Sequence, residues 1–274
     1  MAVTMADIAH LRKMSGAGMM DCKNALEEAN NDFEKAMEII RKKGQAVAAK
    51  RSDRDASEGC VLAADNGDFA AIVALKCETD FVAKNADFVA LTQSFLDAAM
   101  SNKPATLDEL LALPLGDGRS VENHITDRIG VTGEKMELGF YEFAKGAATV
   151  SYIHPGNKLA TIVAFNQAIE RQVARDVAMQ VAAMNPVSIT PDEVPQKVVD
   201  LEIEVAKDKA RQAGKPENML DRIAQGALQK FYKENTLLQQ DFIKEQKITV
   251  QQYLLQQDKA LTATSFKRVT LNLE

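Results

Sequence analysis

The sequence has 274 residues, of which 46% are hydrophobic and 26% charged, and its formal net charge is −6. These proportions exclude a disordered chain, and the length allows one large domain or two to three small ones. The longest apolar run, residues 69–75, is far shorter than the roughly 18 residues of a membrane span, and the mild acidity argues against a general nucleic-acid binder. The three cysteines are widely spaced and include no CxxC pair, which favours reduced thiols in a cytoplasmic protein.

The first 54 residues show the pattern of three short helices. Apolar residues recur at i, i+3, i+4 and i+7 over residues 22–29 and again over residues 33–40. Basic residues followed by Gly44 predict that the third helix ends there, because cations and an αL glycine favour helix C-termini. The basic stretch at 50–54 then predicts a linker. A bundle this small buries little apolar surface, so we expect a recognition module.

Two later segments look like copies of one strand-and-helix unit. Residues 69–75 (FAAIVAL) resemble residues 159–165 (LATIVAF), and each segment is predicted to be the second strand of a hairpin, with turns at 65–68 (DNGD) and 155–157 (PGN). Between strand and helix the first copy has about eleven residues, 76–86, where the second has roughly four. We expect function in a loop that is added to a repeated scaffold, because loops carry sites that scaffolds position.

The remaining segments are mostly helical. Residues 101–134 contain several glycines and prolines and predict loops with one short helix. An antiparallel helical hairpin is predicted at about 192–234, broken at 214–216 (GKP), and its narrow apolar stripe is typical of a projecting arm. A short helix at 249–255 and a strand at 265–273 follow.

The sequence contains no motif of a known catalytic or nucleotide-binding site. It lacks a GxxxxGK[ST] phosphate loop, a GxGxxG after a strand and an HExxH pair. We therefore predict that the protein is not an enzyme and holds neither a metal ion nor another cofactor. A spatial arrangement that uses Asp80 and His154 stays open as an alternative, because residues assembled only by folding leave no sequence motif.

Three surface features are candidates for function. Met19 and Met20 are adjacent, so both cannot face a small core, and a soft methionine contact with a partner is the functional interpretation. In the added loop, either Thr79 or Asp80 acts as a cap while Phe81 and Val82 enter the core, or the loop displays Asp80 and Phe81. The basic residues at 41–54 are a helix end with a solvated linker or an RNA-binding patch, although no aromatic residue is interleaved there for base stacking.

Two long motifs resemble the signatures of the translation elongation factor Ts family. Residues 15–26 (SGAGMMDCKNAL) match the family pattern [TS]GAGMMDCKKAL except at Asn24, and residues 77–85 (CETDFVAKN) match CxTDFVA[KR][ND]. Residues 215–217 and 228–232 are similar to the helical arm of the family and its return. The resemblance thus covers essentially the whole chain.

This resemblance implies a guanine-nucleotide exchange factor that binds elongation factor Tu carrying GDP and promotes GDP release in translation elongation. It implies an α+β fold with a three-helix ubiquitin-associated-like docking domain at 1–54. A duplicated α+β core with antiparallel sheets follows, divided into an N-subdomain at 55–140 and a C-subdomain at 141–274 into which the helical hairpin is inserted. The implied partner-binding residues are Arg12, Met19, Met20, Thr79, Asp80, Phe81, Val82 and His154.

The resemblance also implies how exchange proceeds. Phe81 would wedge between helices of the partner, so that residues 79–82 disturb its magnesium site, while the turn at His154 presses toward its phosphate loop. Some members continue into a C-terminal helix that makes a further contact, and because this chain ends at Glu274 we expect that contact to be absent. The helical arm is associated with dimerisation in some members, and a homodimer through it stays open here; no membrane and no direct nucleic-acid partner is expected.

Overall fold

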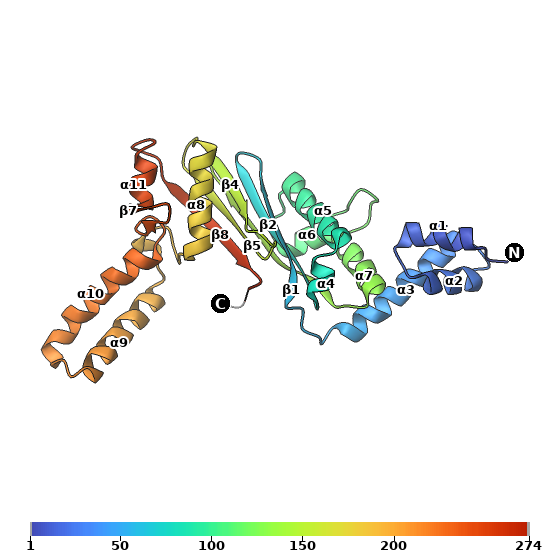
Figure 1. Cartoon of the computed structure of the whole chain (residues 1–274), viewed down its shortest axis with the longest axis horizontal. Coiled ribbons are helices and arrows are strands. Elements are labelled where there is room, and N and C mark those ends of the chain that lie inside the picture. Colours follow the sequence, from blue (N-terminus) through green and yellow to red (C-terminus); the bar gives the residue numbers. More distant parts are fainter. Residues whose placement is uncertain (1, 273–274) are drawn as a thin grey trace. The chain divides into compact units, whose positions relative to one another are not determined.

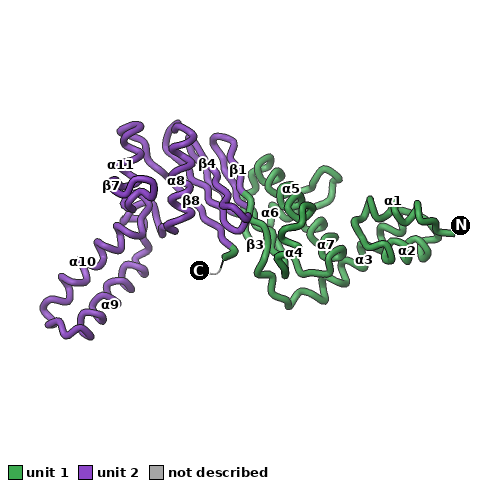
Figure 2. Tube along the Cα trace, viewed as in Figure 1, with its two compact units in different colours: residues 1–62, 73–141, 271–274 green, residues 63–72, 142–270 purple. Residues whose placement is uncertain are grey.

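In the computed structural model, which describes residues 2–272, the chain is a mixed α+β protein with antiparallel sheets, as predicted (Figure 1). The chain forms two compact units (Figure 2). Unit 1 comprises the residues up to 62, residues 73–141 and the residues from 271 on, and unit 2 comprises residues 63–72 and 142–270. The domain boundaries read from the sequence stay predictions. Over residues 2–272, no helix is both long and apolar enough to cross a membrane.

The N-terminal module of unit 1 consists of three helices, α1 (Met5–Ser15), α2 (Met19–Glu28) and α3 (Phe33–Arg51). Thr4 begins α1 with a capping box, in which its hydroxyl accepts from the Asp7 N–H and the Asp7 carboxylate accepts from the Thr4 N–H. Gly16 ends this helix at φ 69°, a conformation that glycine adopts at low cost. The inner faces meet in a small apolar core formed by Ile8, Leu11, Ala17, Cys22, Ala25, Leu26, Ala29 and Ala36.

The third helix is longer than the sequence predicted. Gly44 lies inside α3, and the predicted helix end at this residue is wrong, as is a linker that begins at residue 50. The glycine serves a close helix crossing instead, because a Cβ built on Gly130 of α7 (Val121–Thr132) would lie 2.6 Å from the Gly44 Cα. A glycine after basic residues suits a helix end and a helix crossing equally well, and only the neighbouring helix distinguishes the two.

The rest of unit 1 contains α4 (Asp80–Ala83), α5 (Ala86–Asn102), α6 (Leu107–Ala112) and α7. Residues 101–134 therefore hold two helices where the sequence predicted one short helix among loops. Both begin at a hydroxyl N-cap, Thr106 for α6 and Ser120 for α7. A hydroxyl N-cap is a local sequence signal for the start of a helix, but the nearby glycines and prolines favoured loops in the prediction. The buried side chains of this region include Phe88, Phe95, Leu96, Leu110, Val121 and Ile125.

Two three-stranded sheets share one arrangement, in which a hairpin is extended by a third strand. The first has the order β1 (Glu58–Asp65), β2 (Phe69–Cys77), β3 (Met136–Lys145), and the second has the order β4 (Ala148–Ile153), β5 (Leu159–Phe165), β8 (Ala263–Thr270). In each sheet the second strand of the hairpin is central, which agrees with the sequence repeat. Strand β5 is buried at every position, as expected for a strand with an unbroken apolar sequence. It pairs antiparallel with β4 and with β8.

Unit 2 also contains α8 (Arg171–Met184), a 3-10 turn (Pro191–Glu193), α9 (Gln196–Gln212), α10 (Glu217–Asn235) and α11 (Val250–Leu255). Helices α9 and α10 pack side by side as the predicted hairpin (Figure 1). A small ribbon of β6 (Asp241–Phe242) and β7 (Glu245–Thr249) was not predicted, because two residues give no readable alternation. Strand β8 ends at Thr270, three residues before the predicted limit, and residue 273 lies outside the described residues.

Candidate partner-binding site

The α1–α2 surface, defined by Arg12, Met19 and Met20, lies on the outer side of the N-terminal module. Met19 is 41% exposed and Met20 is 65% exposed, so neither methionine enters the module core. Arg12 is exposed as well, and with Ala9, Lys13 and Met19 it lines a surface hollow of about 310 Å³. Methionine side chains are flexible and polarisable. The surface therefore offers an adaptable apolar contact bordered by positive charge.

The Phe81 turn, residues 79–82, is a single turn of helix. Helix α4 spans Asp80–Ala83, and Thr79 is its N-cap. Ala83 is buried, whereas Phe81 on the opposite side is 85% exposed, the highest value among the large hydrophobic residues that the structure describes. The interpretation in which Phe81 enters the core is thus wrong, and the loop displays this ring.

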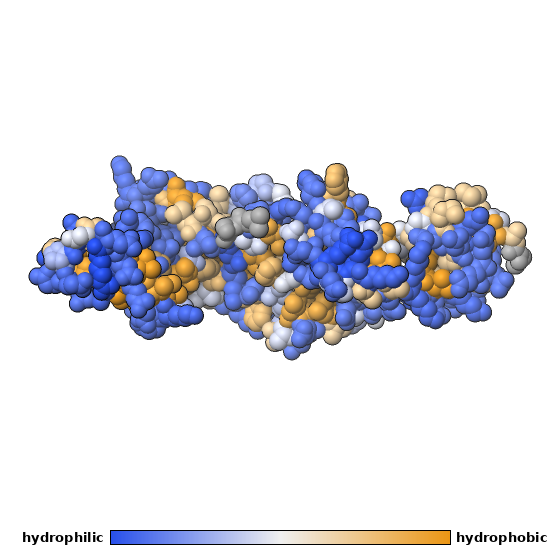
Figure 3. All heavy atoms as spheres, turned by 90° about the horizontal axis from the view of Figure 1, so that it is seen from below, coloured by the Kyte–Doolittle hydropathy of each residue, from blue (hydrophilic) through white to orange (hydrophobic). Residues whose placement is uncertain are grey.

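Exposed apolar residues alone do not identify a site. On the face seen in Figure 3, hydrophobic residues form patches among hydrophilic ones, as on most proteins. What distinguishes Phe81 is that nearly its whole side chain is exposed while its neighbour Val82 is partly buried and Ala83 is buried. The ring is therefore presented by a turn that is itself anchored in unit 1.

Asp80 is held at the start of the same turn. Its Oδ2 accepts a hydrogen bond from Lys84 Nζ at 2.6 Å, and this bond raises the pKa of Lys84. Both side chains are largely exposed, so the ion pair adds little to stability. The turn thus presents a carboxylate next to an aromatic ring.

Two glutamates that the sequence did not indicate hold the base of this turn. The Glu134 carboxylate accepts from the Thr79 N–H at 3.1 Å and from Thr79 Oγ1 at 2.5 Å. The Glu78 carboxylate accepts from the Lys135 N–H at 2.7 Å and from Arg54 Nη1 at 2.9 Å. These hydrogen bonds, first from Lys135 and then from Arg54, lower the pKa of Glu78. The partners lie more than fifty residues apart in three of the four bonds, which is why no local pattern could reveal them.

Carboxylates bind several cations of the basic segment at 41–54. Arg51 Nη1 lies 3.9 Å from the Glu78 carboxylate, and Lys43 is hydrogen-bonded to Asp21. The basic segment thus forms structural ion pairs and is helical through Arg51.

His154 lies in the turn between β4 and β5, in unit 2. Its side chain is exposed, and its Nδ1 lies 3.0 Å from the hydroxyl of buried Tyr152. Gly156 at φ 93° and Asn157 at φ 54° form the turn, as their tolerance of positive φ predicts. Asp80 and Phe81 belong to unit 1. The local neighbours are thus a tyrosine for His154 and a lysine for Asp80, and neither pair is a catalytic arrangement.

The described residues include no group of three or more His, Cys, Asp or Glu side chains that could hold a metal ion. Exposed methionines, phenylalanines and arginines are residue types that are enriched in surfaces that bind other proteins.

Comparison with known proteins gives one family. The family model described as Elongation factor TS matches residues 78–272. Over the full length of both chains, the sequence is 72% identical to Elongation factor Ts of Porphyromonas gingivalis and 55% identical to Elongation factor Ts of Azobacteroides pseudotrichonymphae. It is 50% identical to Elongation factor Ts of Phocaeicola vulgatus in an alignment of 331 positions that covers both chains completely.

Proposed function

This chain belongs to the elongation factor Ts family, the exchange factors of elongation factor Tu, and we propose that its Phe81 turn carries out the step that loosens GDP. In this role the chain performs no covalent chemistry, and the magnesium ion and phosphates are those of the partner. We also propose that the protein acts in the cytoplasm.

The observation that carries the proposal is the exposure of Phe81. A phenylalanine that is 85% exposed leaves most of its apolar surface in water, and burying such a ring is worth about 1.5–3 kcal/mol. That gain becomes available only when a partner provides a pocket. In the proposal, the pocket opens between helices of elongation factor Tu when residues 79–82 displace the groups that support its magnesium ion.

The α1–α2 surface supplies affinity in this scheme. Arg12, Met19 and Met20 dock on the GTPase domain of the partner, and the docking holds the Phe81 turn at its target. His154, on a different turn, is proposed to press toward the phosphate loop. Its exposure permits such a contact.

Ordinary contact energies are large enough to loosen GDP in this scheme. GDP and the exchange factor weaken each other's binding by the same factor, because coupling between two ligands is reciprocal. A 10⁴-fold loosening corresponds to about 5.5 kcal/mol of differential binding. Phe81 alone would supply a factor of about 10 to 150, and the remainder would come from Asp80, Val82 and the docking contacts.

The test is the release of a fluorescent GDP analogue from elongation factor Tu at increasing concentrations of this protein. We expect Asp80→Ala combined with Phe81→Ala to lower the maximal release rate while binding is largely retained. Substituting Met19 and Met20 by alanine should instead raise the concentration needed for half-maximal rate. Phe140→Ala is the matched control, since Phe140 is 41% exposed on β3 outside the proposed contacts. Release as fast with the double variant as with wild type would refute the wedge.

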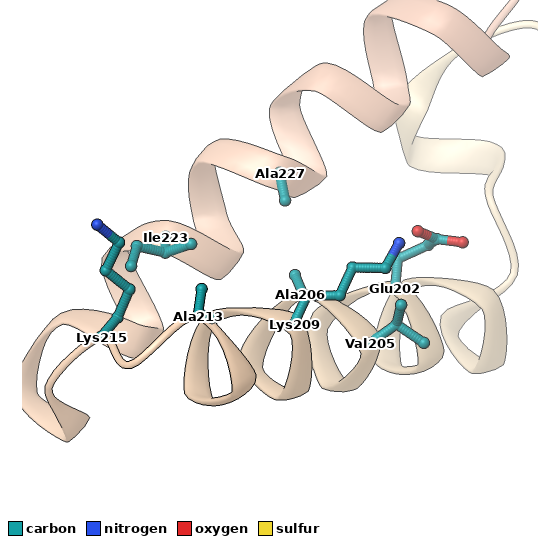
Figure 4. A pocket seen from close by; sticks show the side chains of 9 residues that line it. Glu202, Val205, Ala206, Lys209, Ala213, Lys215, Ile223 and Ala227 are labelled. Atoms are coloured by element: carbon teal, nitrogen blue, oxygen red, sulfur yellow. The ribbon is translucent and has the colours of Figure 1, made fainter.

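A second copy of the chain is a further proposed partner, through the hairpin of α9 and α10. A hollow of about 430 Å³ between these helices is lined mainly by small or apolar side chains, among them Ala206, Ala213, Ile223 and Ala227 (Figure 4). Leu201 on α9 is 56% exposed. Sedimentation equilibrium should show a dimer that Leu201→Glu dissociates, and a monomer at all concentrations would reject this proposal.

A further inference from the structure

The Phe81 turn is too short to hold its own shape. Helix α4 has four residues, and an isolated turn of this length is unstable because nucleation costs more than its first hydrogen bonds return. Its side-chain cap is also long, with 3.5 Å between the Val82 N and Thr79 Oγ1. The direction in which Phe81 points therefore depends on contacts from outside the turn.

Glu134 provides the most direct of these contacts. One of its carboxylate oxygens accepts from the Thr79 N–H and the other accepts from the Thr79 hydroxyl, at 3.1 and 2.5 Å. Two hydrogen bonds from one residue to both oxygens of one carboxylate fix orientation as well as position, and bonds to an ionised acceptor are stronger than neutral ones. Glu134 is itself placed by Gly133, which ends α7 at φ 73°.

A second set of contacts involves the neighbours of these two residues, Glu78 before Thr79 and Lys135 after Glu134. Glu78 accepts from the Lys135 N–H and from Arg54, and Lys135 Nζ donates to the Arg54 carbonyl at 2.8 Å. Residues 78–79 are thus bound to residues 134–135 and to the chain just after α3. All these groups belong to unit 1.

We propose that Glu134 is a positioning residue for nucleotide exchange, which acts by holding Thr79 so that Phe81 is presented in one direction. This inference rests on the proposed function of the Phe81 turn. A ring that is already ordered before binding does not have to lose conformational freedom in the complex, so more of its burial energy is available for displacing groups of the partner. The glutamate itself need not touch the partner.

Glu134→Gln is the sharpest test, because it preserves shape while removing the negative charge that strengthens both hydrogen bonds from Thr79. Its NH₂ group can bond the Thr79 hydroxyl only if that hydroxyl accepts instead of donating. We expect the maximal rate of GDP release from elongation factor Tu to fall roughly tenfold, which corresponds to about 1.4 kcal/mol. The concentration for half-maximal rate should change much less, because the α1–α2 surface is untouched. Glu142→Gln is the matched control on β3, where Glu142 pairs with Lys267 at 2.9 Å, and it should leave both quantities unchanged.

A double-mutant cycle separates positioning from a general structural role. In the Phe81→Ala background, Glu134→Gln should cause a much smaller further loss, because the ring that it positions is gone. An equal loss in both backgrounds would overturn the proposal. If Phe81→Ala slows release and Glu134→Gln alone does not, this inference fails while the proposed function stands; if Phe81→Ala has no effect, both fail.

A measurement on the free protein gives an independent readout. The sequence contains no tryptophan, so Phe81→Trp introduces a single tryptophan at the tip of the turn, and its fluorescence can be excited at a wavelength where the four tyrosines do not absorb. Adding Glu134→Gln should lower its time-resolved anisotropy on the nanosecond scale, whereas Glu142→Gln should not. Thr79→Ser, which keeps both donors, should behave like wild type, and unchanged anisotropy in the Glu134→Gln variant would overturn the proposal.

Discussion

The crossing of α3 and α7 should reverse the usual effect of replacing a helical glycine by alanine. Inside an exposed helix this change stabilises by about 1 kcal/mol, because alanine has the higher helix propensity. At Gly130, however, the new Cβ would lie 2.6 Å from the Gly44 Cα, a backbone atom of another helix that cannot rotate away. The two helices must then separate.

The magnitude follows from these two opposing terms. Overpacking a close contact costs typically about 1–3 kcal/mol, against a propensity gain of about 1 kcal/mol. We therefore expect Gly130→Ala to destabilise unit 1 by about 1 kcal/mol. Gly226, in the interior of α10, supplies the matched control, because a Cβ there meets no atom within 4 Å. Gly226→Ala should stabilise its helix.

Urea unfolding followed by circular dichroism measures the two changes. Because two compact units need not unfold together, hydrogen exchange should locate the effect, with faster exchange in α3 and α7 for Gly130→Ala and slower exchange in α10 for Gly226→Ala. A Gly130→Ala variant that is as stable as wild type or more so, with unchanged protection of α3, would refute the argument from the helix crossing.

Three further predictions concern the core and its polar contacts. Burial opposes ionisation of Asp65, but its hydrogen bonds, above all those from Arg171, outweigh this and lower its pKa. The ionised Asp65 therefore stabilises the fold fully at a pH above its pKa in the unfolded chain, about 3.9, and this stabilisation is lost as the pH falls through the lower pKa of the folded state. Asp65→Asn should accordingly make the free energy of unfolding in urea depend less on pH in this acidic range. Burial raises the pKa of Tyr141 to about 12, as it does for Tyr253, so Tyr141→Phe should reduce the amplitude of this late transition in a spectrophotometric titration. The substitution should also cost about 1 kcal/mol through the lost 2.8 Å bond to the Pro104 carbonyl. Leu237 is completely buried, and Leu237→Ala should lower the free energy of unfolding by about 2–5 kcal/mol, again measured in urea; a loss below about 1 kcal/mol would contradict tight packing around it.

The sequence by itself determined the elements whose signals are local. The DNGD turn at 65–68 joins β1 and β2 as predicted, because its residues favour the tight turn wherever they occur. Strand β5 has the predicted limits, and the break at 214–216 separates α9 from α10. Repetition of a strand and helix likewise identified the added loop that carries Phe81.

Tertiary structure decided the features that depend on distant partners. The close crossing of α3 and α7 depends on Gly44 and Gly130 meeting backbone to backbone, and the exposure of Phe81 depends on how α4 is anchored through Ala83 and Thr79. Glu134 and Thr79 are 55 residues apart in sequence and form one hydrogen-bonded unit. Helix, turn and strand preferences are properties of neighbouring residues, whereas a helix crossing or the direction of a single side chain is set by groups that meet only when the chain has folded.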